Sequence, residues 1–402
     1  MMKIIEGGIC AAKGFLAVGI HAGIRKNTQK PDLAIIYSEQ PAIAAGVFTT
    51  NLVKAAPIIV TQEFIKSGTL QAVVINSGNA NACTGDVGMR HARIMAQTTA
   101  EQLQLKPEQV AVASTGVIGV TLPIEKITEG IVSAAKKISV EGHNTAWAIM
   151  TTDTFPKSIA IAMQIAGKTI HIGGIAKGSG MIHPNMATML GFITTDIVIK
   201  PAALQQALIA VNQASFNMIT VDGDSSTNDM VLALANGMAQ NASIESIDDP
   251  NWQIFLEGLN FVCTFLAKEI ARDGEGATKL IEVQVEGAVN LAEARIAARA
   301  VCRSPLVKTA IHGADANWGR IASALGASGA NLNPNKLCIA LDYLPLMQNG
   351  TPLDFDEAFA QTLLKQKLIT IKINLAMGEA KAMAWGCDLT PEYIQINASY
   401  RS

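Results

Sequence analysis

Short apolar runs alternate with helical patterns along the first half of the chain. Continuous apolar runs at 33–37 and 72–76 end in small or polar residues, which predicts two buried strands. The stretch 89–103 has the spacing of a helix. At 158–173, apolar residues alternate on both sides of a Gly167-Lys168 pair, which predicts a β-hairpin. The first half of the chain therefore mixes strands with helices.

The second half continues this mixture. Its patterns predict helices at 201–217, 251–272, 291–301, 318–325 and 354–364, and strands at 279–285, 337–341, 368–375 and 393–398. The order of these elements predicts a mixed α/β (α+β) fold class. No long linker interrupts the chain, and we divide it by pattern into an N-terminal part, 1–195, and a C-terminal part, 196–402.

The composition argues against several classes of protein. The chain has 402 residues, of which 49% are hydrophobic and 16% are charged, and its net charge is −2. A balance this close to neutral argues against nucleic acid, or a polybasic membrane surface, as the partner. No apolar window reaches the ~18 residues of a membrane span, and the first residues do not have the pattern of a signal peptide. We therefore expect a cytoplasmic protein, and its low charge is compatible with a buried subunit interface.

The sequence predicts no metal site. The six cysteines are scattered without a C-x-x-C pair, and the six histidines share no metal-ligand spacing. The acidic loop at 222–229 lacks the residue order of a calcium loop, and we expect it to be a hydrogen-bonded loop near the active centre. No phosphate-binding loop signature is present either.

The candidate chemistry is concentrated in the glycine-rich stretch 177–190, KGSGMIHPNMATML. It contains Ala187 followed by Thr188. A threonine hydroxyl is a weak nucleophile unless a base activates it, and the α-amine of an N-terminal threonine can serve as that base. Cleavage between Ala187 and Thr188 would create such a residue. Taken alone, however, an Ala-Thr pair is more often structural.

The whole stretch resembles the processing site of the ornithine acetyltransferase family, the bifunctional enzymes of the cyclic arginine pathway. Further segments that resemble the family lie in the expected order at 48–51, 76–81, 114–119, 151–157, 273–279 and 397–402. The resemblance spans the chain. It implies two α/β domains with the active site at their interface, and a self-processed enzyme whose α fragment is 1–187 and whose β fragment is 188–402.

The resemblance also implies roles for single residues. It marks Thr188 as the nucleophile, and Thr115 and Gly116 as the donors that stabilise the oxyanion, a task that suits a hydroxyl and a backbone N–H. Five further residues, together with Thr188, are marked as substrate-binding: Thr154, Lys177, Glu275, Asn397 and Ser402.

The reaction implied is transfer of an acetyl group from N2-acetylornithine to glutamate, through an acetyl-Thr188 intermediate. It needs no cofactor, and some members of the family use acetyl-CoA as a second acetyl donor. The resemblance implies an α2β2 heterotetramer or a larger assembly. Two other interpretations stay open at this point: an N-terminal-nucleophile aminopeptidase or amidase, and an α/β binding protein that is never processed.

Overall fold

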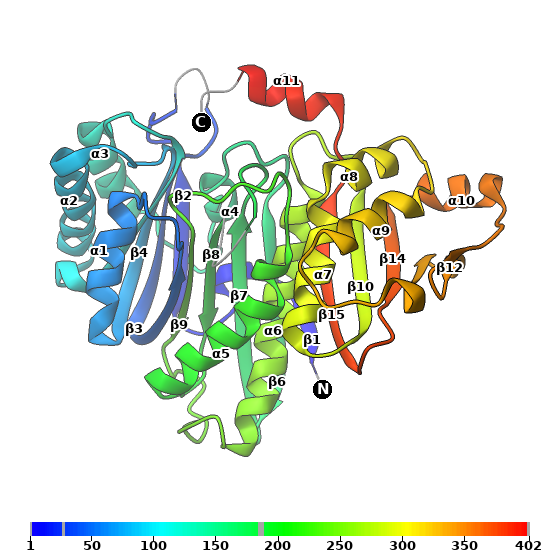
Figure 1. Cartoon of the computed structure of the whole chain (residues 1–402). Helices are drawn as coiled ribbons and strands as arrows, with labels where there is room; N and C mark the ends of the chain where they lie inside the picture. The colour runs from blue at the N-terminus through cyan, green and yellow to red at the C-terminus, as the bar shows by residue number, and fades with distance from the viewer. Residues whose placement is uncertain (1, 26–28, 184–188, 400–402) are drawn as a thin grey trace.

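The computed structural model describes residues 2–25, 29–183 and 189–399. Within these ranges the strands form two sheets, one of nine strands and one of six, with helices around both (Figure 1). The strands of the larger sheet are β1 (Lys3–Ile5), β2 (Phe15–Ile20), β3 (Leu33–Phe48), β4 (Thr69–Asn79), β5 (Val110–Val117), β6 (Lys157–Ile165), β7 (Lys168–Lys177), β8 (Leu190–Thr195) and β9 (Met230–Ala235). The smaller sheet contains β10 (Leu280–Ala288), β11 (Cys338–Leu341), β12 (Leu344–Gln348), β13 (Thr351–Pro352), β14 (Leu368–Asn374) and β15 (Ala380–Cys387).

The helices lie between and around these strands. They are α1 (Ala56–Phe64), α2 (Gly85–Leu103), α3 (Ile124–Ala135), α4 (Thr145–Ala148), α5 (Pro201–Ala214), α6 (Pro250–Arg272), α7 (Leu291–Arg303), α8 (Pro305–His312), α9 (Trp318–Gly326), α10 (Glu357–Leu364) and α11 (Pro391–Ser399). No helix of the described ranges has the length and apolar character needed to cross a membrane.

The nine-stranded sheet brings distant parts of the chain together. Its order is β1-β6-β7-β8-β9-β3-β4-β5, with β2 paired to β3. The central strand β9 runs parallel to β8 and antiparallel to β3. At the far edge, β4 and β5 are parallel and are joined by the crossover helix α2. The ends of β5, β7 and β9 can therefore contribute to one site although they are far apart in the sequence.

Strand β9 shows why this sheet is buried on both faces. Its sequence MVLALA is apolar at every position, and every residue is buried. Alternate side chains of a strand point to opposite faces. Accordingly, Val231 belongs to the core that contains α5 and α6, whereas Leu232 belongs to the core that contains α1, α2 and α3. A strand buried on both faces reads as a continuous apolar run rather than as an alternation.

The six-stranded sheet has the order β13-β12-β11-β14-β10-β15. Helix α7 packs on β10 and β15, and α6 reaches from the larger sheet to β15. The apolar residues of both regions join in one core cluster. The two sheets are thus connected through a shared core, and Figure 1 shows α6 and α7 in this central region.

Most of the predicted elements are present. The hairpin predicted at 158–173 is β6 and β7, and the helix predicted at 251–272 is α6. The mixed α/β fold class is confirmed. The nine-stranded sheet draws on residues from both sides of position 196, because β9 lies within it. The division into 1–195 and 196–402 stays a prediction.

The strand predicted at 393–398 is wrong, because this segment belongs to the helix α11. Pro391 at the start of α11 suits the first turn of a helix, where its missing N–H is not needed. None of the α11 residues is buried, and Ile394 is 66% exposed. Without a neighbouring strand to pair with, the apolar and polar alternation at 393–398 does not produce a strand.

Candidate active site

A cavity of about 200 Å³ lies where the ends of several elements meet. Its lining includes five of the predicted site residues: Thr115, Gly116, Lys177, Glu275 and, from α11, Asn397. Met181 and Met189, which flank the central part of the glycine-rich motif, complete one side. The structure therefore brings together residues that are far apart in the sequence, next to the motif that carries the predicted cleavage point.

Thr115 and Gly116 lie at the end of β5, beside β4. Gly116 has a φ of +135°, in the region that favours glycine. A Cβ atom added there would lie 2.3 Å from the carbonyl carbon of Gly78 and 2.4 Å from the nitrogen of Asn79. The Thr115 hydroxyl accepts a hydrogen bond from the Lys177 ammonium at 3.4 Å. The lack of a side chain at position 116 is thus what permits the close approach of β4.

Lys177 is the last residue of β7 and is 7% exposed. Burial lowers the pKa of its ammonium, and the Asp153 carboxylate opposes this effect. Its Nζ lies 4.0 Å from Oδ2 of Asp153. A buried cation beside a hydroxyl can stabilise negative charge that develops in the cavity.

A buried ionic cluster fixes the start of the glycine-rich motif. The Lys157 ammonium donates to Asp153 at 2.7 Å and to Asp273 at 2.6 Å, and all three side chains are nearly inaccessible to solvent. Asp153 also accepts a hydrogen bond from the backbone N–H of Gly178 at 2.7 Å. The Ser179 hydroxyl donates to the carbonyl of Asp273 at 2.6 Å. These contacts tie the end of β7 to the end of α6, which positions Lys177 and Glu275 relative to each other.

Glu275 follows the end of α6 and is 8% exposed. Its Oε2 accepts a hydrogen bond from Nδ2 of Asn397 at 2.8 Å. An added Cβ at Gly180 would lie 2.4 Å from the Glu275 carboxyl carbon, so glycine leaves the room that this carboxylate occupies. The carboxylate is therefore held on one side by the motif and on the other by α11.

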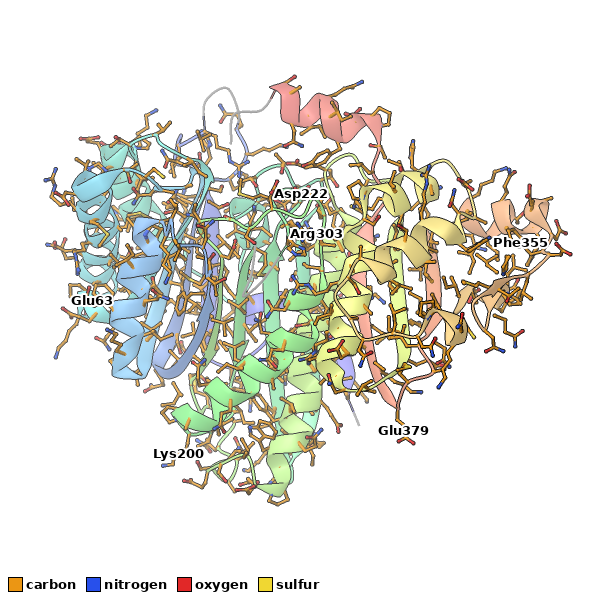
Figure 2. All side chains as sticks on the ribbon, in the orientation of Figure 1. Glu63, Lys200, Asp222, Arg303, Phe355 and Glu379 are labelled. Atoms are coloured by element: carbon orange, nitrogen blue, oxygen red, sulfur yellow. The ribbon has the colours of Figure 1, made fainter. Side chains whose placement is uncertain are left out.

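The acidic loop at 222–229 lines the cavity, as its composition led us to expect. Asp222 accepts hydrogen bonds from the backbone N–H groups of Met181 and Ile182 at 2.6 and 2.8 Å. The Tyr393 hydroxyl of α11 lies 3.3 Å from the same carboxylate. Figure 2 shows Asp222 beneath α11, with Arg303 close by. This loop thus supports the glycine-rich motif up to Ile182.

The other predicted residues have different positions. Thr154 is exposed and does not line the cavity; its hydroxyl and its backbone N–H both donate to Asp273. Ala187, Thr188 and Ser402 lie outside the described residues. Their predicted roles, like those of the residues that line the cavity, stay predictions. Across the described ranges, no group of three His, Cys, Asp or Glu side chains could hold a metal ion.

His183 is the last described residue before the predicted cleavage point. Burial, together with the Arg299 and Arg303 guanidinium groups, lowers its pKa to about 4. Its Nδ1 lies 3.1 Å from the hydroxyl of Thr220, and its Nε2 lies 3.0 Å from Arg299. His183 is therefore neutral at neutral pH.

The comparisons with known proteins identify the family. A model of the ArgJ family matches residues 16–402. The chain belongs to the ArgJ family. This is the ornithine acetyltransferase family that the motifs resemble, so the resemblance is confirmed.

Individual members of the ArgJ family match closely. The chain is 55% identical over 403 residues to the arginine biosynthesis bifunctional protein ArgJ of Symbiobacterium thermophilum, and the match covers 100% of both chains. It is 52% identical over 402 residues to the protein of the same name from Bacillus licheniformis, covering 100% of this chain and 98% of the relative. The crystal structure of arginine biosynthesis bifunctional protein ArgJ from Bacillus halodurans matches with 48% identity and a TM-score of 0.50. That match covers 52% of this chain and 97% of the solved chain.

Some residues of the site were not assigned a role from the sequence. Asp153, Lys157 and Asp273 occur in segments that resemble the ArgJ family. Lys157 and Asp153 are four positions apart, but the contact between Lys157 and Asp273 spans 116 positions. Tyr393 was placed on a predicted strand. Asp229 was taken only as part of the acidic loop. Asp153 and Asp273 lie in polar segments, so the local sequence gave no signal that these charges are buried; a buried charge requires a partner, and here the structure supplies it.

Proposed function

We propose that this ArgJ-family chain transfers the acetyl group of N2-acetylornithine to glutamate, giving ornithine and N-acetylglutamate. The observation that carries the proposal is the cavity, which brings Thr115 and Gly116, the buried Lys177 and the carboxylate of Glu275 next to the two flanks of the glycine-rich motif. This set contains a candidate oxyanion site and a candidate site for a substrate ammonium.

The mechanism begins with self-cleavage. The Thr188 hydroxyl attacks the carbonyl of Ala187, and water opens the resulting ester to leave Thr188 as a new N-terminus. A free α-amine has a pKa of about 7.7–8.0, so a useful fraction is neutral near physiological pH and can take the proton of the hydroxyl. The acetyl donor then acylates Thr188, ornithine leaves, and glutamate takes the acetyl group in a ping-pong sequence.

Substrate recognition follows from charge. In this proposal Glu275, oriented by Asn397, pairs with the side-chain ammonium of ornithine. Lys177 binds a substrate carboxylate or stabilises the oxyanion together with Thr115, whose hydroxyl it contacts. Thr154 and Ser402 remain predicted contributors to substrate binding.

The sheet topology supports continued association of the two fragments. Strand β7 belongs to 1–187 and β8 to 188–402, yet they pair along six positions in the middle of one sheet. Strand β9 of the second fragment also pairs with β3 of the first. Cleavage would therefore leave both fragments in one hydrogen-bonded sheet and one core. We expect them to assemble further into an α2β2 heterotetramer or a larger oligomer.

Two features of the relatives add support. The solved Bacillus halodurans chain matches about half of this chain over nearly its own full length, which is the extent of one fragment of a processed chain. The relatives are named bifunctional, which favours acetyl-CoA as a second acetyl donor to glutamate. No organic cofactor or metal takes part in the proposed reaction.

A denaturing gel and an intact mass test the processing. Purified protein should give fragments 1–187 and 188–402, and Thr188→Ala should give a single chain. An active protein that contains only the uncleaved 42.3 kDa chain would refute the mechanism. Acetyl transfer from N2-acetylornithine should depend on glutamate; release of ornithine at the same rate without glutamate would instead indicate an amidase or aminopeptidase.

The oxyanion role has its own test. Thr115→Ala should lower turnover by up to about 10²–10³-fold if the hydroxyl is a full donor, while the melting temperature stays close to that of the wild type. Self-cleavage should slow as well, because it passes through a similar tetrahedral state. Unchanged turnover would remove Thr115 from the site.

A further inference from the structure

The cavity contains a buried carboxyl group that the reaction described so far does not use. Asp229 precedes β9 and is 1% exposed, and it lines the cavity together with Thr115 and Lys177. Its Oδ2 has no hydrogen-bond partner in the described part of the chain. Buried polar atoms without partners are uncommon in native proteins, and catalysis is one of the reasons for which they are retained.

Two other acidic side chains of the cavity, Glu275 and Asp222, differ in this respect. Glu275 accepts a hydrogen bond from Asn397. Asp222 accepts hydrogen bonds from two backbone N–H groups of the glycine-rich motif, at Met181 and Ile182. Both carboxylates therefore have structural partners, whereas one oxygen of Asp229, a residue that lines the cavity, has no partner among the described residues.

Hydrogen bonds on both sides fix the position of Asp229. Nδ2 of the preceding residue, Asn228, donates to the carbonyl of Ser114 at 2.8 Å. The backbone N–H of the following residue, Met230, donates to the carbonyl of Met189 at 3.0 Å. Ser114 precedes Thr115, and Met189 follows Thr188 in the sequence. Asp229 is thus held between the predicted oxyanion donors and the residue that follows the predicted nucleophile.

Burial, rather than neighbouring charge, favours a carboxyl group at position 229 that keeps its proton. Burial raises the pKa of Asp229 well above its ordinary value, and the Lys177 ammonium and hydrogen bonds from Ser226 and Thr49 oppose this only in part. The other charged or titratable groups that line the cavity are Asp222, Asp224, Glu275 and Tyr393. Lys177 in turn interacts with Asp153, Lys157 and Arg25. A carboxylic acid whose pKa is raised keeps its proton to a higher pH than an ordinary one, which suits a general acid.

We propose that Asp229 is a catalytic residue that gives a proton to the nitrogen leaving the acetyl donor and takes a proton from the nitrogen of the acetyl acceptor. This inference rests on the transfer reaction proposed above. An amide nitrogen leaves readily only when it gains a proton, and an amine that accepts an acetyl group must lose one. A transfer of acetyl from one amine to another is therefore helped by a residue that acts first as an acid and then as a base.

The protons balance over the two half-reactions. In the first, the nucleophile oxygen bonds to the acetyl carbon, its base takes the hydroxyl proton, the C–N bond of the donor breaks, and Asp229 gives its proton to the leaving nitrogen. The products are an ester, a free amine, a carboxylate and a protonated base. In the second, the acceptor nitrogen bonds to the acetyl carbon and loses a proton to the Asp229 carboxylate. The C–O bond breaks, and the protonated base returns its proton to the oxygen.

Two acetyl donors separate this role from a structural one. N2-acetylornithine loses an amine that must be protonated, whereas 4-nitrophenyl acetate loses a phenolate that needs no proton. Asp229→Asn should lower acylation by N2-acetylornithine by about 10²–10⁴-fold and acylation by the aryl ester by less than about tenfold, with the acetyl group detected by mass on fragment 188–402. Equal losses with both donors would overturn the proposal.

Asp196→Asn is the matched control. Asp196 is also buried, but it contacts His171 and Lys13 and does not line the cavity. A change that acts through folding lowers both rates together, so the ratio of the two rates in this variant should equal that of the wild type.

The wild-type enzyme provides a test that does not require the variant to fold or to be processed. Its acylation by N2-acetylornithine should fall on the alkaline side as Asp229 loses its proton, whereas acylation by the aryl ester should not show this fall. If the two pH profiles are parallel, the proposed role of Asp229 is refuted, but the proposed acetyl transfer is not. A wild-type enzyme that transfers no acetyl group from N2-acetylornithine would refute the proposed function itself.

Discussion

Replacing Glu275 with glutamine removes one charge from the cavity and nearly preserves the size of the side chain. The carboxylate lies between Asn397, which donates to it at 2.8 Å, and Gly180, which has no space for a side chain because of it. The Glu275 backbone N–H also donates to the carbonyl of Ser179 at 2.9 Å. A glutamine confined in this way should occupy the same place, so the variant tests charge rather than shape.

The expected magnitude follows from burial. Removing one partner of a buried, hydrogen-bonded charge pair costs about 2–5 kcal/mol, and much of this cost comes from the charge left unpaired. At 1.36 kcal/mol per factor of ten, this corresponds to about 30-fold to several thousand-fold. Glu275 is 8% exposed, so the substrate ammonium would lose its partner in a site with little access to solvent. The loss should appear in kcat/KM for acylation by N2-acetylornithine.

Separate half-reactions give the decisive measurement. Deacylation by glutamate should suffer less than acylation by N2-acetylornithine, because glutamate has no side-chain cation. Glu392→Gln makes the same chemical change at an exposed position of α11, and it should alter either rate by no more than about twofold. If Glu275→Gln lowers both half-reactions equally, Glu275 orders the site and does not recognise the substrate.

The remaining predictions concern the structure that supports the site. Gly116→Ala places a Cβ 2.3 Å from the backbone of Gly78, so we expect melting temperature and activity to fall together; a wild-type melting temperature would contradict this. Lys157→Met leaves Asp153 and Asp273 buried without their ammonium partner, and urea unfolding should show a loss of about 3–5 kcal/mol; a loss below about 1 kcal/mol would contradict it. Burial raises the pKa of Asp153, but the Lys157 and Lys177 ammonium groups outweigh it and hold the pKa below its usual range. The stabilisation from Asp153 is therefore complete above the unfolded pKa of about 3.9 and is lost as the pH falls further. The acid-side decline in the free energy of unfolding should be shallower in Asp153→Asn.

The sequence predicted best where local pattern and tertiary environment agree. The hairpin of β6 and β7 was predicted because alternation and a tight turn are both local. Helix α6 was predicted because its helical pattern is long and is followed by Asp273-Gly274. The structure adds a cap at its start, where the Asp249 side chain accepts a hydrogen bond from the backbone N–H of Asn251. Elements of this kind need little information from the rest of the chain.

The sequence was a poor guide to secondary structure where contacts with distant segments decide between helix and strand. Strand β9 is a continuous apolar run, and such a run fits a buried helix as well as a buried strand. The segment 393–398 has an alternating pattern but forms part of α11, and no strand in the described part of the chain pairs with it. Position in a sheet depends on partners that are distant in the chain, so the local pattern cannot supply it.

The sequence alone determined the family and the candidate chemistry. The motifs that resemble the family lie within short segments, and each is recognised from adjacent residues, such as Thr115-Gly116 or the glycine-rich stretch that begins at Lys177. The family can therefore be recognised without knowing how these segments contact one another in the folded protein. The model of the ArgJ family accordingly matches the chain from residue 16 to its end.

Only the tertiary structure decided how the candidates are arranged. It placed Thr115 against Lys177, gave Glu275 the amide of Asn397 as its partner and directed the hydroxyl of Thr154 to Asp273 rather than to the cavity. It also gave one oxygen of Asp229 no hydrogen-bond partner among the residues that it describes. These relations depend on the order of strands in the sheet and on burial, which are properties of the whole chain. Periodicity and turn chemistry act over a few residues, and they cannot specify which buried charge meets which partner.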